Sequence, residues 1–357
     1  MLAPARVPSV TDLNVHPFGS APDSLPLVVE PGRDRSPRAL ADYLNAERDW
    51  VHDAMRRHGA LLFRGFAVDR PHDFEVIARA VDNELKNEYL GTSPRDALTE
   101  YVFSASELPG YYPIPQHCEM SFVKNFPRRI FFCCLIAPAD GGETPLVDFR
   151  KVYADLDPRV RQRFVDRGIR IIRNYSGPDG GGRFDLWKLK RWDEMFRTTD
   201  RAAVEAKCRE EGFEPAWGAG ERLRLVSEHD AVRNHPETGE PVWFNHALVF
   251  HLSAAPGEYR RIYDRRGDLR SFFFWNLSRL LVAVKGSTPA ADQAMHCTYR
   301  DGSEIPDADM EHLRDVVWKH MVITPWRKGD VFAIDNHSVG HGRLPYSGPR
   351  QVAVCWA

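Results

Sequence analysis

The chain has 357 residues, of which 43% are hydrophobic, 27% are charged and 11% are aromatic. It can therefore bury a sizeable core, which excludes a disordered, collagen-like or membrane-spanning protein. Its 48 Lys and Arg residues balance 50 Asp and Glu residues, for a formal net charge of −2, so no bulk charge attracts it to nucleic acid or to an anionic membrane.

Neither the N-terminus nor any internal window contains an apolar run long enough for a signal peptide or a membrane-spanning helix. The cysteines form no C-x-x-C pair, which favours buried, reduced thiols over disulfides or a zinc site. Both observations predict a cytoplasmic protein. The cysteines are Cys118, Cys133, Cys134, Cys208, Cys297 and Cys355.

The expected elements follow in chain order. Residues 1–35 are Pro-rich and weakly patterned, so we expect an N-terminal extension that lies over the surface. Amphipathic or capped segments predict helices at 38–58, 72–85, 158–167, 200–211 and 310–321. Apolar runs bounded by Gly, Pro or Asn predict strands at 60–66, 129–137, 223–228, 242–251, 320–326, 331–335 and 351–356.

The Gly-rich stretch 177–182 predicts a mobile loop, and a lid would be its functional interpretation. Two sets of strands with helices between them predict a mostly β fold, namely a jelly-roll-like barrel with helical additions.

The first chemical motif is the segment 116–120, QHCEM. His117 and Glu119 are two residues apart, so in an extended segment they point to the same side. Two histidines and one carboxylate on one face form the metal site of non-haem Fe(II) oxygenases. Because roughly two H-x-[DE] matches are expected by chance, the motif alone is weak. A second match, His235 and Glu237 in HPETGE, is interpreted as a solvated turn because Pro236 disfavours a strand.

The second motif is the segment 329–350, GDVFAIDNHSVGHGRLPYSGPR, in which a strand ends before His341 and a final strand opens at Arg350. Together with H-x-E and the GGET of 141–144, it resembles the Fe(II)/2-oxoglutarate oxygenases of the taurine dioxygenase (TauD/TfdA-like) family. Clavaminate synthase-like and SyrP-like members look most similar to this chain, judged by the sequences of the segments HCEMSF, HPETGEPVWFN and DNHSVGHGRLPYSGPR. The resemblance covers roughly residues 58–357, and the motifs are specific in combination.

The resemblance implies a double-stranded β-helix (jelly-roll, cupin-like) core that uses Fe(II), 2-oxoglutarate and O2. It implies that His117, Glu119 and His341 are the catalytic iron ligands, and that Arg350 and Thr144 hold 2-oxoglutarate. A guanidinium can bind a carboxylate through two hydrogen bonds. Arg343 is the rival anchor. We favour Arg350 because a strand needs several residues to turn back before its arginine faces the cavity.

Glu119 also bears on the type of oxidation. Iron halogenases that resemble this family carry a small residue in place of the carboxylate, so Glu119 argues for hydroxylation or a related oxidation.

Several residues near the motifs are interpreted as structural. Isolated histidines close to strands usually are, and Asp335 and Asn336 are expected to fix the turn before His341. The histidines concerned are His246, His251, His296 and His337. Candidates for the substrate cavity are Met120, Ser121, Phe122 and Asn245, with core packing as the alternative for Met120 and Phe122.

One basic cluster has two interpretations. We favour a solvated face, and docking to an acidic carrier protein is the alternative. The cluster consists of Arg260, Arg261, Arg265 and Arg266.

We therefore predict an Fe(II)- and 2-oxoglutarate-dependent oxygenase that hydroxylates an unactivated C–H bond of an amino acid or amino-acid-derived intermediate of specialised metabolism. The substrate is free or held on a carrier protein, and 2-oxoglutarate becomes succinate and CO2. Desaturation, epoxidation or cyclisation are alternatives on the same centre. A cupin-type metal isomerase or lyase would need no carboxylate clamp, and an intact ligand trio argues against a non-catalytic binding module.

The same hypothesis constrains the domains. Length alone suggests about two or three of them, but Glu119 and His341 must meet at one iron ion. We therefore expect residues 36–357 to form a single domain, with a helical and loop insertion at about 145–320 that covers the substrate. The sequence predicts no oligomeric state.

Overall fold

The computed structural model describes residues 13–91, 95–178 and 191–357. Its largest sheet has seven strands, and every neighbouring pair in it is antiparallel except β2 and β3. The order is β1 (Leu13–Pro17), β2 (Leu27–Pro31), β3 (Ala60–Phe63), β15 (Val331–Asp335), β6 (Arg129–Ile136), β18 (Gln351–Trp356) and β4 (Phe103–Ser104).

The sequence of β6, RIFFCCLI, explains why this sheet lies inside the molecule. Successive side chains of a strand point to opposite faces. Accordingly Phe132 and Cys134 belong to one core cluster, and Phe131 and Cys133 belong to another. The second cluster is formed with the helices near the N-terminus, and the first faces the remaining sheets. A strand covered on both faces reads as a continuous apolar run, as this one does.

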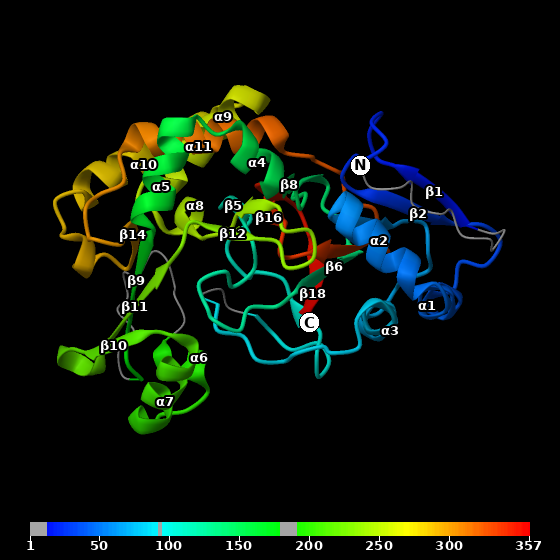
Figure 1. Cartoon of the computed structure of the whole chain (residues 1–357), viewed down its shortest axis with the longest axis horizontal. Coiled ribbons are helices and arrows are strands. Elements are labelled where there is room, and N and C mark those ends of the chain that lie inside the picture. Colours follow the sequence, from blue (N-terminus) through cyan, green and yellow to red (C-terminus); the bar gives the residue numbers. More distant parts are fainter. Residues whose placement is uncertain (1–12, 92–94, 179–190) are drawn as a thin grey trace.

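The helices of the described residues lie on both sides of this sheet (Figure 1). They are α1 (Pro37–Ala46), α2 (Arg48–His58), α3 (Pro71–Val81), α4 (Phe149–Asp155), α5 (Pro158–Arg167), α6 (Trp192–Phe196), α7 (Arg201–Glu211), α8 (Ala247–Phe250), α9 (Ala254–Arg266), α10 (Leu269–Lys285) and α11 (Asp307–His320).

A second, three-stranded sheet has the order β5 (Ile114–His117), β16 (Val339–Arg343) and β8 (Leu146–Asp148). It lies against the inner face of the large sheet, because the ring centroid of Phe132 on β6 is 4.9 Å from that of His341 on β16.

A four-stranded sheet forms the other lobe of the molecule with the later helices (Figure 1). Its order is β10 (Glu214–Trp217), β11 (Leu223–His229), β9 (Ile169–Tyr175) and β14 (Met295–Tyr299). Helix α8 contacts β5 on one side and β9 and β14 on the other, so it links this sheet to the three-stranded one. Two short pairs complete the sheets: β12 (Val232–Asn234) with β13 (Pro241–Trp243), and β7 (Asp140–Gly141) with β17 (Tyr346–Ser347).

Most of the expected elements are present. Helices α3, α5, α7 and α11 lie close to their expected ranges, and Asp200 caps α7 by accepting a hydrogen bond from the backbone N–H of Ala202 at 2.9 Å. The expected helix at 38–58 is two helices, because Glu47 has non-helical torsions (φ −109°, ψ 41°). All six cysteines are free and buried, which confirms the prediction of buried thiols.

Other expectations were met only in part. Helical residues outnumber strand residues, so the fold is mixed rather than mostly β, and the hydrogen-bonded sheets of the described residues do not join into a closed barrel. Of 242–251 only the first residues form a strand, because helix α8 begins at Ala247, whose N–H donates to Oδ1 of Asn245 at 2.9 Å. Within 320–326 only Val322 forms a bridge, with Leu146.

The sequence reading also missed elements. Helix α9 was missed because Pro256 and Gly257 suggest a break, although a proline in the first turn gives up no helical hydrogen bond. The expected surface extension contributes β1 and β2 to the large sheet. The expected mobile loop at 177–182 lies, from residue 179 onward, outside the described residues. Among the described helices, none has the length and apolarity that crossing a membrane requires; the cellular location stays a prediction.

Candidate metal centre

Three side chains that are distant in the sequence meet at one buried point. One ligand atom each from His117, Glu119 and His341 lies within 4.8 Å of the other two, and Nε2 of His341 is 3.6 Å from Oε2 of Glu119. The pairing of β5 with β16 places His117 directly opposite His341, with ring centroids 4.5 Å apart. Two imidazoles and a carboxylate form a donor set that suits Fe(II).

His117 is held in the form that a metal requires. Its Nδ1 is 2.8 Å from the carbonyl oxygen of Pro115, so this nitrogen carries the proton and Nε2 keeps its lone pair. Burial, followed by the neighbouring His341, lowers the pKa of His117 to about 4. The ring is therefore neutral near pH 7.

Glu119 is held as a carboxylate by a residue that the sequence reading missed. Burial raises the pKa of Glu119, but the charge of Arg95, followed by the neighbouring His341, outweighs burial, and the net pKa is lowered. Nη2 of Arg95 donates to Oε2 of Glu119 at 3.0 Å. The Arg95 guanidinium also lies over the rings of Tyr89 and Trp356, at 4.3 and 5.7 Å from their centroids. No motif marked Arg95 as part of this site.

Asn336 fixes the backbone of Glu119 from the other side. Its Oδ1 accepts from the N–H of Glu119 at 2.7 Å, and its Nδ2 donates to the carbonyl oxygens of Glu119 at 3.0 Å and Pro127 at 2.7 Å. Asn336 is fully buried. The residue after Glu119, Met120, has φ 51°, a conformation that a non-glycine residue seldom adopts without such support.

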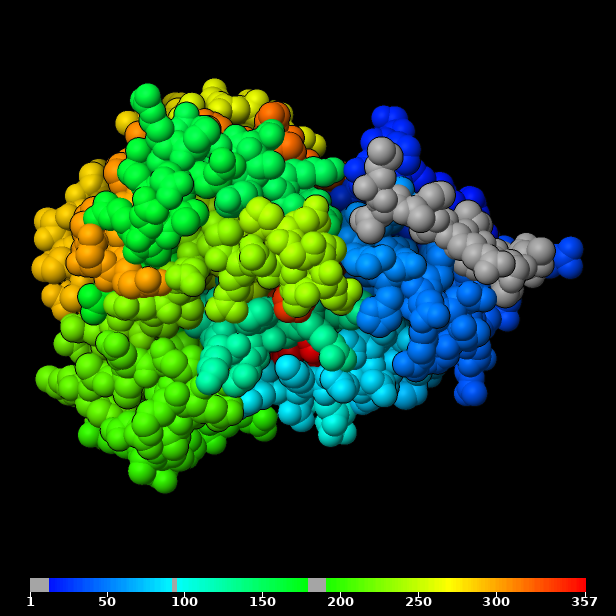
Figure 2. Space-filling model, in the orientation of Figure 1, coloured from blue at the N-terminus to red at the C-terminus, as the bar shows by residue number. Residues whose placement is uncertain are grey.

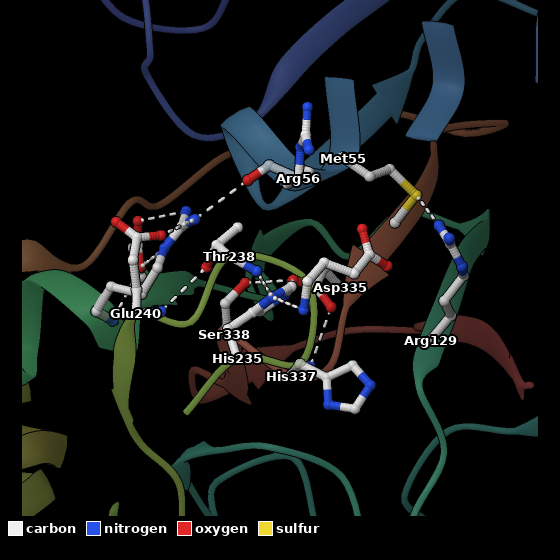
Figure 3. Close-up of polar contacts among 12 residues, drawn as sticks. Met55, Arg56, Arg129, His235, Thr238, Glu240, Asp335, His337 and Ser338 are labelled. Carbon is white, nitrogen blue, oxygen red and sulfur yellow. Dashed lines mark hydrogen bonds and ion pairs between the residues drawn. The ribbon is translucent and has the colours of Figure 1, made fainter. Parts of the chain in front are cut away.

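Asp335 holds the turn that carries Asn336 (Figure 3). Its carboxylate accepts hydrogen bonds from Nε2 of His235 at 2.9 Å, from the hydroxyl of Ser338 and from the N–H of His337 at 3.1 Å. The expected role of Asp335 and Asn336 in this turn is therefore confirmed. The expectation that HPETGE is a solvated turn was wrong for His235, which is buried and donates from Nε2 to Asp335.

A hollow opens over this network, with atoms from the C-terminal part of the chain on its floor (Figure 2). It is lined by His52, Met55, Arg56, Arg128, Arg129, His235, Glu237, Asp335 and His337.

The two rival anchor arginines differ in their surroundings. Arg343 is buried, and its two Nη atoms donate to four carbonyl oxygens at 2.9–3.1 Å. Arg350 is half-buried and its Nε donates to the carbonyl oxygen of Gly142 at 2.9 Å. Burial, then the charge of Arg343, lowers the pKa of Arg350 to about 10, so it remains a cation near pH 7. The carbonyl oxygens around Arg343 belong to Ser106, Leu108, Pro109 and Tyr112.

The GGET segment lies beside these arginines. Gly142 has φ 70°, and a Cβ there would meet Cδ of Arg350 at 3.0 Å, so the position requires glycine. Thr144 is buried, two residues before β8, and the neighbouring Glu143 accepts a backbone hydrogen bond from Leu344 at 3.2 Å.

Comparisons with known proteins place this geometry in a family. The model of the family described as taurine catabolism dioxygenase TauD, TfdA family matches residues 23–356. The chain belongs to the TauD/TfdA family. Enzymes of this family are Fe(II)- and 2-oxoglutarate-dependent dioxygenases, so this chain is one, with Fe(II), 2-oxoglutarate and O2 as cofactor and co-substrates.

Two individual proteins are similar to this chain in sequence, and one solved structure is similar to it in fold. The chain is 30% identical over 304 residues to the dapdiamide synthesis protein DdaC of Enterobacter agglomerans, covering 85% of this chain and 83% of that protein. It is 30% identical over 321 residues to a clavaminate synthase-like protein of Arabidopsis thaliana, with 87% and 84% covered. The crystal structure of the PvcB protein of Pseudomonas aeruginosa has the same fold, with a TM-score of 0.51 at 16% identity over 98% of this chain and 92% of that one.

In this TauD/TfdA enzyme, His246 lies beside the three residues without joining them. Its ring centroid is 4.9 Å from that of His117, and its Nδ1 is 2.6 Å from the hydroxyl of Ser121. Burial, then His117, lowers its pKa well below the usual value. His246 is a buried neutral ring that separates the centre from the four-stranded sheet.

A second trio, His251, His296 and Glu304, also brings ligand atoms within 4.8 Å of one another. Its hydrogen bonds favour a structural role. Nδ1 of His296 accepts from the N–H of Leu252 at 3.3 Å, so the proton of that ring lies on Nε2, which is 2.8 Å from Glu304. Nδ1 of His251 likewise accepts from the N–H of Ser253 at 3.3 Å.

The remaining candidates are placed as follows. Met120 and Phe122 are buried in the core, and Asn245 donates to the carbonyl oxygen of Ala231 at 2.8 Å and accepts from the N–H of Ala247 at 2.9 Å. In the basic cluster, Arg260 and Arg261 pair with Glu311 at 3.2 Å. Nη2 of Arg266 donates to the carbonyl oxygen of Pro345 at 3.0 Å.

Asn336 gives the first testable prediction. In Asn336→Ala, the backbone of Glu119 loses both of its side-chain hydrogen bonds, so we expect Fe(II) affinity to fall about 10- to 100-fold. Isothermal titration with Fe(II) under anaerobic conditions measures this affinity. Asn234→Ala, at an exposed position on β12, is the matched control and should bind as the wild type does. A folded Asn336→Ala protein with unchanged affinity would contradict the assigned role.

Proposed function

We propose that His117, Glu119 and His341 bind the catalytic Fe(II), that Arg350 and Thr144 hold 2-oxoglutarate, and that the enzyme hydroxylates an unactivated C–H bond of an amino acid or amino-acid derivative. The observation that carries this proposal is the convergence of the three ligand atoms at one buried point. Nδ1 of His341 is buried without a hydrogen-bond partner among the described residues, and such unsatisfied buried polar atoms are typical of sites that bind an ion or take part in catalysis.

The proposed fold of this site is a double-stranded β-helix core. The seven-stranded and three-stranded sheets face each other across Phe132 and His341, which supports the two walls of such a core. The division into an extension at 1–35 and a single domain at 36–357, with an insertion at about 145–320, belongs to the same proposal. Helix α8 and the four-stranded sheet supply the wall of this insertion that lies nearest to the ligands.

Hydrogen bonding favours Arg350 over Arg343 as the 2-oxoglutarate anchor. The four carbonyl oxygens around Arg343 already use its Nη donors. Arg350 has only its Nε hydrogen bond to Gly142 in the described part of the chain, so its Nη atoms are available to a carboxylate. Thr144, close to the same segment, offers a hydroxyl.

The protein's own contribution is to prepare and shield the ligands. When bound, Fe(II) couples the reduction of O2 to the decarboxylation of 2-oxoglutarate and to oxidation of the substrate, which releases succinate and CO2. His117 stays neutral because it is buried, and Glu119 stays ionised because Arg95 lies against it. Phe132 packs on the ring of His341 and excludes water from that side.

The substrate class rests on resemblance. DdaC is named for dapdiamide synthesis, which supports a substrate from specialised metabolism. Whether that substrate is free or carried on a protein belongs to the proposal as two alternatives. Desaturation, epoxidation and cyclisation would use the same residues with a different placement of the substrate.

Iron-dependent succinate release tests the proposal. With Fe(II), 2-oxoglutarate and O2, screening amino acids and biosynthetic intermediates should give substrate-stimulated succinate, and His341→Ala should reduce it by a factor of about 1,000 or more. His72→Ala, which alters an exposed histidine of α3, should leave it unchanged. Normal turnover in His341→Ala would show that the ligands are misassigned, and a metal isomerase would release no succinate.

The two arginines give a separate prediction. Arg350→Ala should raise the KM for 2-oxoglutarate about 100-fold, because a charge-assisted pair to its carboxylate is lost. Arg343→Ala should instead lower the melting temperature, because four buried carbonyl oxygens lose their donors. Succinate assays at varied 2-oxoglutarate and thermal melts distinguish them. The reverse pattern would make Arg343 the anchor.

A further inference from the structure

Arg173, on β9, is a buried cation without an acidic partner. Its residue exposure is 1%, and its only hydrogen bond among the described residues runs from Nη1 to the hydroxyl of Tyr175 at 3.1 Å. Nε and Nη2 of Arg173 are buried without any hydrogen-bond partner. Burying a charge in this way is costly unless an opposite charge compensates it.

The other buried arginines of the described residues are compensated. Arg64, Arg129, Arg261 and Arg314 each pair with a carboxylate, and Arg343 donates to backbone carbonyl oxygens. The contrast identifies Arg173 as the exception, because neither a carboxylate nor a set of carbonyl oxygens meets its guanidinium.

The unpartnered atoms of Arg173 form the edge that binds carboxylates elsewhere in this protein. Arg64 uses Nε and Nη2 to hold both oxygens of Asp330, at 3.0 and 2.6 Å. Arg128 uses the same two atoms for both oxygens of Asp82, at 2.7 Å each. In Arg173 this two-pronged edge is the part without partners. Its geometry matches a carboxylate.

The surroundings of Arg173 hold the guanidinium without satisfying this edge. Its Cζ lies 4.4 Å from the ring centroid of Phe122 and 4.7 Å from that of Phe213, contacts that favour a cation over an aromatic ring. On the same face of the sheet, Ser227 is diagonal to Arg173, because Leu225 pairs with Arg173. The hydroxyl of Ser227 is also buried without a partner, and so offers a further hydrogen bond to an anion.

Arg173 is connected to the metal centre through two side chains. The ring of Phe122, which Arg173 contacts, is 4.8 Å from the ring of His246, and His246 is 4.9 Å from His117. The rings of Phe122 and His246 therefore lie between Arg173 and His117, and Arg173 lies on the side of the metal centre that faces the four-stranded sheet.

We propose that Arg173, assisted by Ser227, binds a carboxylate of the substrate. The proposal rests on the proposed function and deepens it, because it assigns the recognition of an amino acid or derivative to its carboxylate. It makes Arg173 a specificity-determining residue of the four-stranded sheet, separate from the Arg350 that anchors 2-oxoglutarate.

The test uses acetate as the carboxylate probe and acetamide as its uncharged counterpart. The wild-type enzyme is loaded with Fe(II) and saturating 2-oxoglutarate without O2, and melted with each probe. Acetate should raise the melting temperature by about 1–2 °C more than acetamide. Arg173→Met should remove this difference, and Arg173→Lys, which keeps the charge but not the two-pronged edge, should retain part of it. Arg170→Met, on the same strand but the opposite face, is the matched control and should behave as the wild type does.

Two outcomes would overturn the proposal. One is an acetate effect that is absent in the wild type or equal in Arg173→Met. The other is a substrate-free melting temperature that falls strongly in Arg173→Met, since removing an uncompensated buried charge should leave stability unchanged or raised. The visible charge-transfer absorption of the Fe(II)–2-oxoglutarate complex separates a failure of this proposal from a failure of the proposed function. The absorption should appear in the wild type and in Arg173→Met alike. Its absence from both would count against the iron and 2-oxoglutarate assignment instead.

Discussion

The pairing of β5 with β16 is the constraint on which the site depends. It sets His117 opposite His341, although the two residues belong to different motifs that are far apart in the sequence. Neither strand could hold Glu119 alone, because Glu119 follows the end of β5. Asn336, in the turn between β15 and β16, binds both sides of the Glu119 backbone and so ties the third residue to the same strand pair. The large sheet supplies β15 and therefore positions that turn.

Charge in this region is arranged by burial and by pairing. His117 and His246 are buried and neutral, with lowered pKa values, whereas Glu119 remains ionised because Arg95 compensates it. Asp335, which is also buried, is compensated by hydrogen bonds from His235 and Ser338. In contrast to these compensated charges, Nε and Nη2 of Arg173 have no hydrogen-bond partner among the described residues, and a substrate carboxylate would supply one.

Local patterns in the sequence were sufficient for much of the fold, whereas the three converging residues were predicted from the resemblance to a family. The continuous apolar run of β6 and the capped helices depend on neighbouring residues, which a sequence displays. Arg95 and Asn336 act through contacts with residues far along the chain, and no local pattern reports such contacts. The excess of helix was missed for a related reason: the proline in α9 suggests a break, whereas its position in the first turn makes it harmless.

Anomalous diffraction at the iron absorption edge, from crystals grown with Fe(II) and 2-oxoglutarate without O2, tests the central claim most directly. The account predicts one strong peak between Nε2 of His117, a carboxylate oxygen of Glu119 and Nε2 of His341. A peak at another place, such as beside His251, His296 and Glu304, or no peak at all, would contradict it.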